Sequence, residues 1–194
     1  MAAARLAELQ ALLRAHAPAD ATEAGHLARM LELCAAGEEA ALDPFARGCF
    51  APGHFTASAF VLSPARTELL LILHARLGFW MQPGGHVDPE DRGVLAAALR
   101  ELREETGLVD VAPWPPATAG LLDVDIHPIP ARRDEPAHEH FDLRWLFASR
   151  SRDLRESAET RGIRWVPLDR VPGLRSDASV LRALQRTRAL LAGA

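Results

Sequence analysis

The chain has 194 residues, of which 48% are hydrophobic and 25% are charged, a balance typical of a folded globular protein. Its formal net charge of -4 argues against a protein that binds nucleic acid over a broad surface, but does not exclude a small anionic ligand, because a metal ion can supply the missing positive charge. The two cysteines, Cys34 and Cys49, are too few for a disulfide scaffold or a zinc motif. Because the sequence shows neither a signal segment nor an apolar run of about 20 residues, we expect a cytoplasmic protein that does not cross a membrane.

Residues 1–50 predict a helical extension that differs in character from the rest of the chain. Leucines recur at helical spacing from Leu6 to Leu13, and Pro18 ends that segment. A second helix is predicted from Asp20, with Glu23 completing a capping-box-like pair, to about residue 37. We expect a helical hairpin that either packs on the main domain, residues 51–194, or forms the contact of a homodimer.

The main domain alternates strand-like and helical patterns. Strands are predicted at residues 54–62, 68–75, 120–129, 141–149 and 163–168. Pro- and Gly-rich segments at 79–91 and 109–116 predict a loop and a connection, and between them lies an alanine-rich helix that Gly107 closes. A final amphipathic helix is predicted at 176–191, with Ser176 as its N-cap. Mixed strands with few helices indicate the α/β class, with a mixed sheet covered by helices on both faces.

The alanine-rich helix places three carboxylates close together. At about 100° per residue, Glu101, Glu104 and Glu105 form one narrow stripe, although like charges at this spacing destabilise a helix. The stripe borders the core face expected at Leu95, Ala98, Leu99 and Leu102. Two interpretations follow: a solvated charged face, or a site for a hard divalent cation, which prefers carboxylate oxygens.

The segment from Arg100 to Leu108 resembles the core of the Nudix box. That pattern is Arg-Glu, an aliphatic residue, any residue, Glu-Glu, any residue, Gly and an aliphatic residue. Every fixed position is matched, at Arg100, Glu101, Leu102, Glu104, Glu105, Gly107 and Leu108. The preceding "PGGHV" resembles the family's loop entry, with Gly85 as the leading glycine.

The glycine end of the box departs from the family pattern. Asp91 stands where the family usually has Glu, and the segment before Arg100 is one residue longer. If Gly84 is the start instead, Glu90 takes the acidic position and the segment is two residues longer. Asp88 and Asp91 have an alternative role as the helix N-cap.

The resemblance implies a Nudix-like α/β/α sandwich that hydrolyses a pyrophosphate bond with Mg²⁺ or Mn²⁺. The implied metal ligands are Glu101, Glu104 and Glu105, with Arg100 orienting a carboxylate through a charged hydrogen bond. Glu104 or Glu105 is the expected general base, and Glu135 and Glu139 are loop alternatives. The expected substrate contacts are Arg76, Gly84, Gly85 and His86.

Histidines and aromatic residues supply further candidates. At period two, His138, His140 and Asp142 share one strand face and predict a second metal or phosphate cluster, with loop or core histidines as the alternative. Other histidines expected near the site are His54, His74, His86 and His127. For Phe79, Trp80 and Trp114 the alternatives are stacking on a nucleobase and buried packing.

Three functional interpretations remain at the level of sequence. The first is a pyrophosphohydrolase acting on a nucleoside diphosphate linked to another moiety or on a (d)NTP. The second is a non-catalytic nucleotide sensor with the same fold, a class that generally loses box acids. The third is an enzyme like isopentenyl-diphosphate isomerase, which needs a cysteine that the loop before this box lacks.

Overall fold

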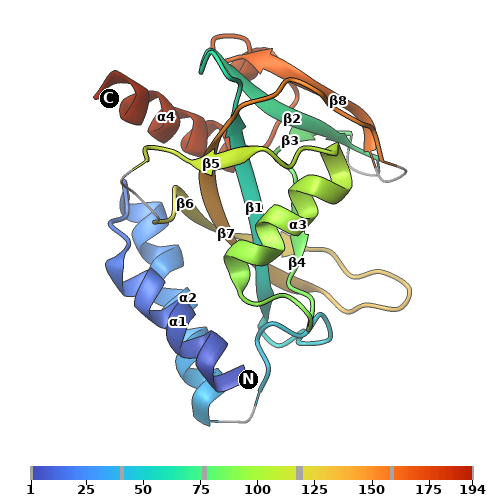
Figure 1. Ribbon diagram of the computed structural model, residues 1–194. Coiled ribbons are helices and arrows are strands. Elements are labelled where there is room, and N and C mark those ends of the chain that lie inside the picture. Colours follow the sequence, from blue (N-terminus) through green and yellow to red (C-terminus); the bar gives the residue numbers. More distant parts are fainter. Residues whose placement is uncertain (1, 40–41, 76–77, 117–119, 158–159, 194) are drawn as a thin grey trace.

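The computed structural model describes residues 2–39, 42–75, 78–116, 120–157 and 160–193 (Figure 1). Its helices are α1 (Ala2–Ala15), α2 (Ala21–Glu39), α3 (Val94–Thr106), α4 (Ala178–Ala192) and a short 3₁₀ helix, Val171–Gly173. Its strands are β1 (Gly53–Leu62), β2 (Glu68–His74), β3 (Trp80–Met81), β4 (Gly84–His86), β5 (Val111–Pro113), β6 (Asp123–Ile129), β7 (His138–Ser149) and β8 (Thr160–Pro167).

One mixed sheet of eight strands forms the centre of the described chain, in the order β3-β2-β1-β7-β5. β1 runs parallel to β7 along its whole length, from the pair Gly53–Glu139 to the pair Leu62–Ala148. The other pairings are antiparallel: β6 lies on β7, β8 on β2, and β4 on the first half of β1. The predicted mixed sheet is therefore confirmed.

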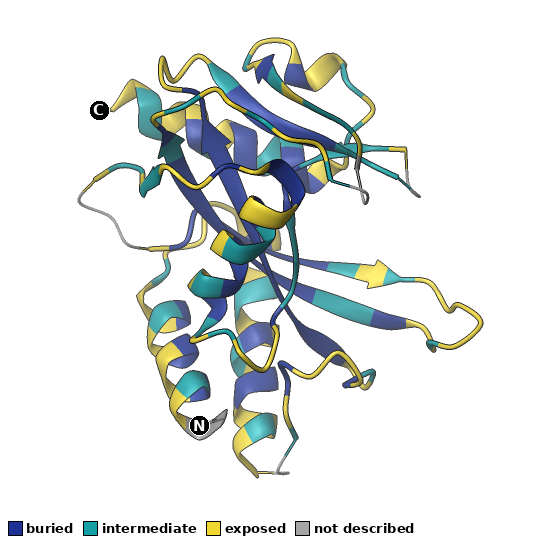
Figure 2. Ribbon diagram, turned by 45° about the vertical axis from the view of Figure 1, so that its right-hand side comes forward, coloured by how far each residue is buried: buried dark blue, intermediate teal, exposed yellow. Residues whose placement is uncertain are grey.

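Helices cover both faces of this sheet. In β1, Phe55 and Ala57 face a hydrophobic cluster that includes residues of α1, α2 and α3, whereas Phe60 and Leu62 face a second cluster with α4. This alternation follows from the period of two in a strand. Because helices cover both faces, β1 is buried at every position (Figure 2). The α/β/α arrangement expected from the sequence is confirmed.

The N-terminal hairpin packs on the main domain. Leu9, Leu13 and Met30 belong to the same buried cluster as the sheet residues, and α2 lies against β6. Glu23 is fully buried there, and its carboxylate accepts hydrogen bonds from Arg186 of α4 at 2.8 Å and from the Val124 N–H of β6 at 3.3 Å. The hairpin therefore shares its core with the sheet, while the homodimer and the division at residue 50 stay predictions.

The expected capping pair at the start of α2 is present. The Glu23 N–H donates to Asp20 Oδ1 at 2.8 Å, and the Glu23 carboxylate accepts from the Ala19 N–H. Gly107 also closes α3 as predicted, with a left-handed φ of 71° and its N–H on the Arg103 carbonyl. Both signals are local, which explains why they can be read without knowledge of the fold.

Several predicted boundaries were wrong. α4 is capped by Asp177, whose side chain accepts from the Ser179 N–H, and not by Ser176. The segment 109–116 contains the strand β5, the loop 79–91 contains β3 and β4, and β7 starts at His138 instead of residue 141. These short or extended strands exist because they pair with β1, β2 and β7, and such pairing is a tertiary effect.

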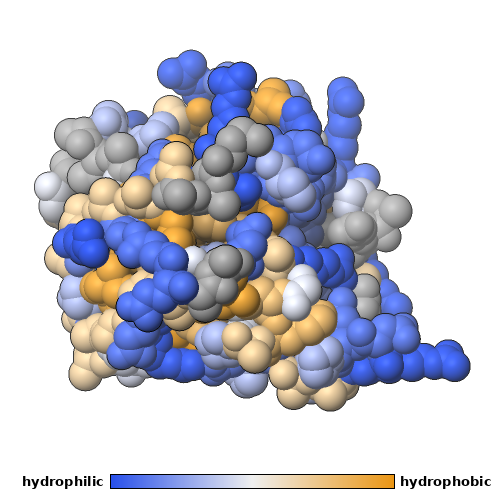
Figure 3. All heavy atoms as spheres, turned by 90° about the horizontal axis from the view of Figure 1, so that it is seen from below, coloured by the Kyte–Doolittle hydropathy of each residue, from blue (hydrophilic) through white to orange (hydrophobic). Residues whose placement is uncertain are grey.

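The exposed surface carries hydrophobic patches that hydrophilic side chains interrupt, as the view from below shows (Figure 3). Leu95, Leu99 and Val109 are the exposed large hydrophobic residues of the described chain. None of its helices is long and apolar enough to cross a membrane.

Glu23 generates a prediction about acid stability. Burial raises the pKa of Glu23, but the hydrogen bond from His16, that from the Ala19 N–H and the charge of Arg186 outweigh it, so the pKa falls below its ordinary value of 4.5. A carboxylate with a lowered pKa contributes stability above its unfolded-state pKa and loses it as the pH falls through its folded-state pKa. We expect Glu23→Gln to lower the free energy of unfolding at neutral pH by about 1.5–3 kcal/mol. This deficit should shrink below pH 4.5.

Urea denaturation at a series of pH values measures this deficit. The control is Glu32→Gln, which changes an exposed residue of the same helix and should leave the free energy of unfolding unchanged. A deficit equal in both variants, or one that does not diminish in acid, would contradict the role given to Glu23.

Candidate functional site

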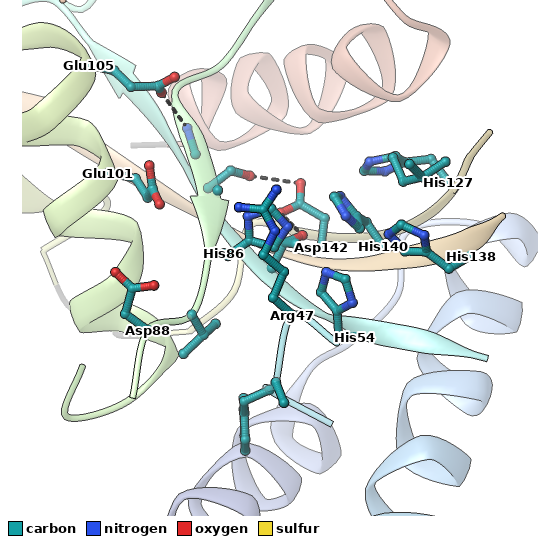
Figure 4. Close-up of a pocket in the computed structure, with 18 of the residues that line it drawn as sticks. Arg47, His54, His86, Asp88, Glu101, Glu105, His127, His138, His140 and Asp142 are labelled. Atoms are coloured by element: carbon teal, nitrogen blue, oxygen red, sulfur yellow. Dashed lines mark hydrogen bonds between the residues drawn. The ribbon is translucent and has the colours of Figure 1, made fainter. Parts of the chain in front are cut away.

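A cavity of about 880 Å³ opens beside the first half of β1. One wall carries the glutamates of α3, and the opposite wall carries histidines from β1, β6 and β7 (Figure 4). The loop through β4 lies between these walls and contributes Gly84, Gly85 and His86. Carboxylate and imidazole ligands therefore meet around one solvent-accessible space.

The glutamates of α3 lie closer to the interior than the sequence predicted. The buried face of α3 includes Ala98 and Leu102 as expected, but Leu95 and Leu99 are exposed and Glu105 is buried. Glu101 is half-buried, whereas Glu104 reaches solvent. The helix is thus rotated so that Glu101 and Glu105 form part of the inward face, because that face borders a polar cavity as well as the core.

Glu105 ties α3 to the loop that precedes it. Its Oε2 accepts a hydrogen bond from the Gly84 N–H at 2.9 Å. A side chain at Gly84 would place its Cβ 2.3 Å from that of Ser58 on β1, and a Cβ at Gly85 would lie 2.5 Å from the Glu101 carboxylate. Gly84 therefore needs glycine because β4 packs directly against the backbone of β1, whereas a side chain at Gly85 would displace the Glu101 carboxylate.

Arg100 connects the loop to the acidic stripe through all three of its nitrogens. Nη1 donates to Glu101 Oε1 and to Glu104 Oε2, each at 3.0 Å. Nη2 donates to the His86 carbonyl at 2.8 Å and to Asp91 Oδ2 at 3.0 Å, and Nε donates to Asp91 Oδ1 at 3.1 Å. A planar guanidinium with donors in a fixed fork suits this arrangement better than a lysine ammonium would.

Asp91, and not Glu90, is the upstream acid that meets Arg100. It accepts from two nitrogens of that guanidinium, so the longer loop still delivers a carboxylate to the arginine of the motif. The alternative role for Asp88 and Asp91 as the N-cap of α3 is wrong, since the cap is Gly93 and no side chain bonds there. Asp91 instead accepts the Asp88 N–H at 2.8 Å, which closes the turn.

The acidic wall carries more negative charge than its arginine neutralises. Arg100 lies within 3.4 Å of four carboxylates, those of Asp88, Asp91, Glu101 and Glu104. Burial raises the pKa of Glu101, Arg100 opposes this, and the charges of Glu104 and Asp88 raise it further. Excess negative charge beside a cavity suits a divalent cation, and the all-oxygen donor set is the one that Mg²⁺ and Mn²⁺ prefer.

The histidine wall follows from the register of three strands. His54 of β1, His140 of β7 and His127 of β6 occupy one row of the sheet, because His54 pairs with His140 and His140 with His127. His138 lies two residues before His140 on β7 and therefore on the same face of the strand. The His86 ring centre lies 5.1 Å from that of His54. The expected shared face of His138 and His140 is therefore present.

Asp142, predicted to join that cluster, has other partners. It accepts hydrogen bonds from Ser58 Oγ at 2.9 Å, Thr56 Oγ1 at 3.1 Å and Arg144 Nε at 2.8 Å. The buried Arg144 in turn bonds Asp123 and Asp125 beneath α4. Asp142 thus anchors the floor of the cavity.

Three of these imidazoles, those of His54, His86 and His140, have a pKa below the ordinary value of 6.5, which favours the neutral ring at neutral pH. Burial lowers the pKa of His86 to about 4 and that of His140 to about 2, and neighbouring histidines lower both further. The pKa of His54 is also lowered, by burial first, although the hydrogen bond to the Cys49 carbonyl opposes the shift. Neutral rings can act as metal ligands because each retains one nitrogen lone pair.

The remaining residues proposed from the sequence differ in their relation to the cavity. Arg76 lies outside the described residues. Glu135 borders the cavity but pairs with Arg47 at 3.1 Å, and Glu139 pairs with Arg29 away from the cavity. His74 lines the cavity on the side of β2.

The predicted aromatic stacking residues pack against arginines instead of lining the cavity. The arginine carbon Cζ lies 4.0 Å from the ring centre for Arg164 on Trp80 and 4.3 Å for Arg66 on Trp114. The Cζ of Arg175 lies 4.6 Å from the ring centre of Phe79. None of the three aromatic residues lines the cavity in the described chain.

Sequence reasoning missed the cavity floor and one edge. Thr56, Ser58 and Gln82 surround Asp142, and Arg47 reaches over the histidines from the segment before β1 (Figure 4). The signal in the sequence is the alternation of polar with apolar residues in β1. It does not reveal which face is open until the strands are paired.

Comparison of the chain with known protein families and solved structures identifies its family. A family model described as the NUDIX domain matches residues 53–184. The chain belongs to the Nudix family. No curated protein matches the chain.

Solved structures with similar folds come from several organisms. The C. elegans Ap4A hydrolase binary complex has a TM-score of 0.58 and 22% identity, covering 72% of this chain and 98% of that one. The NUDIX domain of Shewanella oneidensis NrtR, complexed with ADP ribose, has a TM-score of 0.54 and 18% identity over 71% of this chain and 87% of that one. The MutT NUDIX hydrolase from Burkholderia pseudomallei has a TM-score of 0.52 and 26% identity, covering 68% of this chain and 95% of that one. At 22% and 18% identity, the first two similarities show a shared fold alone.

The position of Asp91 generates a prediction for this Nudix loop. Asp91→Asn removes one of the four charged partners of Arg100 and weakens the closure of the turn at Asp88. We expect backbone amides of residues 84–92 to exchange with solvent at least about tenfold faster, as the loss of a charge-assisted hydrogen bond implies.

Hydrogen exchange followed by NMR measures this effect. The matched control is Glu90→Gln, at the exposed adjacent residue, which should leave exchange unchanged. A larger effect from Glu90→Gln than from Asp91→Asn would overturn the assignment of Asp91 as the upstream acid.

Proposed function

We propose that the chain hydrolyses a pyrophosphate bond in a nucleoside diphosphate linked to another moiety, or in a (d)NTP, with Mg²⁺ or Mn²⁺. The single observation that carries the proposal is the convergence of Glu101, Glu104 and Glu105 on one wall of a cavity, with excess negative charge around Arg100. Membership of the Nudix family supports it.

The donor set fits a hard divalent cation. Glu101 and Glu104 present carboxylates on either side of Arg100 Nη1, and Glu105 lies at the buried end of the same stripe. We assign these three residues as the metal ligands. A divalent ion bound there would polarise the phosphate oxygens and lower the pKa of bound water.

The protein's own contribution is to position these groups. Arg100 fixes the orientation of Glu101 and Glu104, and the Gly84 N–H fixes Glu105. Because Gly84 and Gly85 carry no side chain, the backbone of β4 leaves the cavity open beside the carboxylates. We propose Glu104, the most exposed of the three, as the residue that accepts a proton from the attacking water.

The sensor alternative predicts binding without turnover. It is less well supported because all three box acids are present and face the cavity. The isomerase alternative needs a cysteine in the loop before the box, but Cys34 lies in α2 and Cys49 before β1, both buried. Cytoplasmic location and a homodimer stay predictions from the sequence.

A substrate screen tests the proposed reaction. The first compounds are ADP ribose and Ap4A, named for two similar structures, followed by other nucleoside diphosphate derivatives and (d)NTPs. With Mg²⁺ or Mn²⁺ we expect release of phosphate or a nucleotide from at least one compound, and loss of that release when a chelator removes the ion. Tight binding of one compound without turnover of any would support the sensor instead.

Two variants test the residue roles on the best substrate. We expect Glu104→Gln to lower kcat by about 100-fold or more, because it removes a metal ligand and the proton acceptor together. The control, Glu156→Gln, changes an exposed carboxylate that does not line the cavity and should retain full activity. Full activity of Glu104→Gln would overturn the metal-site assignment.

A further inference from the structure

A second group of metal-ligand side chains lies across the cavity from the glutamates. His54, His138 and His140 each offer one ligand atom, and these atoms lie within 4.8 Å of one another. Their ring centres are 4.8 Å apart for His54 and His140, 5.1 Å for His54 and His138, and 5.3 Å for His138 and His140. Figure 4 shows the three rings gathered on the side of the cavity away from Glu101 and Glu105.

The backbone fixes this group, because all three residues belong to paired strands. His54 of β1 lies beside His140 of β7 in the parallel ladder, and His138 is two residues earlier on the same face of β7. His54 and His138 are buried. Ligand positions on paired, buried strands vary less than positions on a loop.

Hydrogen bonds select the ring nitrogen that each of two histidines presents. The His54 Nδ1 lies 3.1 Å from the Cys49 carbonyl oxygen, and the His138 Nδ1 lies 2.8 Å from that of Pro136. A carbonyl oxygen only accepts hydrogen bonds, so Nδ1 carries a proton in both rings, and Nε2 is the nitrogen left to bind a metal ion. Metal-bound histidines show the same arrangement, with the second nitrogen donating to a carbonyl.

One of these nitrogens lacks any partner in the described chain. The His54 Nε2 is buried and makes no hydrogen bond there. A buried polar atom without a partner costs free energy, about 1–3 kcal/mol, unless a ligand satisfies it.

We propose that His54, His138 and His140 bind a borderline divalent transition metal such as Zn²⁺, at a site separate from the box glutamates. Imidazole nitrogen suits Zn²⁺, whereas Mg²⁺ prefers oxygen. Three protein ligands leave the fourth tetrahedral position open to the cavity. With Zn–N bonds of about 2.0–2.1 Å, the three nitrogens of a tetrahedral site lie about 3.3 Å apart, so the ligand atoms, which lie within 4.8 Å of one another without the ion, would move closer on binding.

The test uses the full chain, stripped of metal with a chelator and titrated with Zn²⁺ in a large excess of Mg²⁺. Calorimetry should show one equivalent of Zn²⁺ bound to the wild type, and the melting temperature should rise with Zn²⁺ concentration. Separate His138→Ala and His140→Ala variants should bind that equivalent at least about tenfold more weakly.

Two controls distinguish this site from other metal binding. His26→Gln, on α2 outside the cluster, should bind Zn²⁺ as the wild type does. Glu104→Gln should also retain the zinc equivalent, even though it disables the proposed hydrolase. Loss of zinc in Glu104→Gln would place the ion at the box and overturn the proposal, as would unchanged binding in both histidine variants.

Zinc X-ray absorption of the wild type keeps the proposal testable if the histidine variants fail to fold. We expect a nitrogen shell with the outer-shell scattering of imidazole rings. A shell of oxygen alone, or no zinc bound to the wild type, would overturn the proposal. Because these readouts do not depend on turnover, a negative substrate screen would leave them unaffected.

Discussion

The Arg100 guanidinium holds helix α3 and the loop that precedes it in a fixed relation. Its Nη1 orients Glu101 and Glu104 on α3, while Nη2 and Nε hold the His86 carbonyl and Asp91 in the preceding loop. Without that cation the carboxylates would repel one another across a partly buried surface. The remaining negative charge is then directed toward the cavity, where a divalent ion would neutralise it.

The sheet supplies the second constraint, because its register decides which side chains share the cavity with those acids. The parallel pairing of β1 with β7 places His54 beside His140 and Thr56 beside Asp142. The cavity consequently has one wall of carboxylate oxygen and one wall of imidazole nitrogen. Carboxylate oxygen suits Mg²⁺ and Mn²⁺, whereas imidazole nitrogen suits Zn²⁺, and this difference is the physical basis for proposing two separate metal sites in one pocket.

Local chemistry explains the parts of the fold and site that could be predicted. The motif around Arg100, the left-handed cap at Gly107 and the capping pair at Asp20 depend on residues a few positions apart. Residues close in sequence stay close in any fold, so the acidic stripe of α3 could be read directly. The helices and longer strands follow from periodicity in the same way, and their mixture indicates the layered α/β class.

Features that depend on distant pairing could not be predicted. Nothing near His54 in the sequence shows that β7 lies beside it, and the short strands β4 and β5 form only against a neighbour. The sequence prediction misplaced the core face of α3 because Leu95 and Leu99 are more hydrophobic than Glu105. In the structure both leucines are exposed, and Glu105 is buried beside the polar cavity. A hydrophobic pattern locates a buried face but does not detect a buried polar one.

The most direct measurement on the acidic wall is anomalous diffraction from a crystal grown with Mn²⁺, with data collected on both sides of the manganese absorption edge. We predict an anomalous peak among the carboxylates of Glu101, Glu104 and Glu105, at oxygen distances near 2.0–2.2 Å, roughly those of a hard divalent ion. A well-ordered crystal with no manganese at these three residues, or with manganese only among the histidines, would contradict the assignment of the box glutamates as the catalytic metal site.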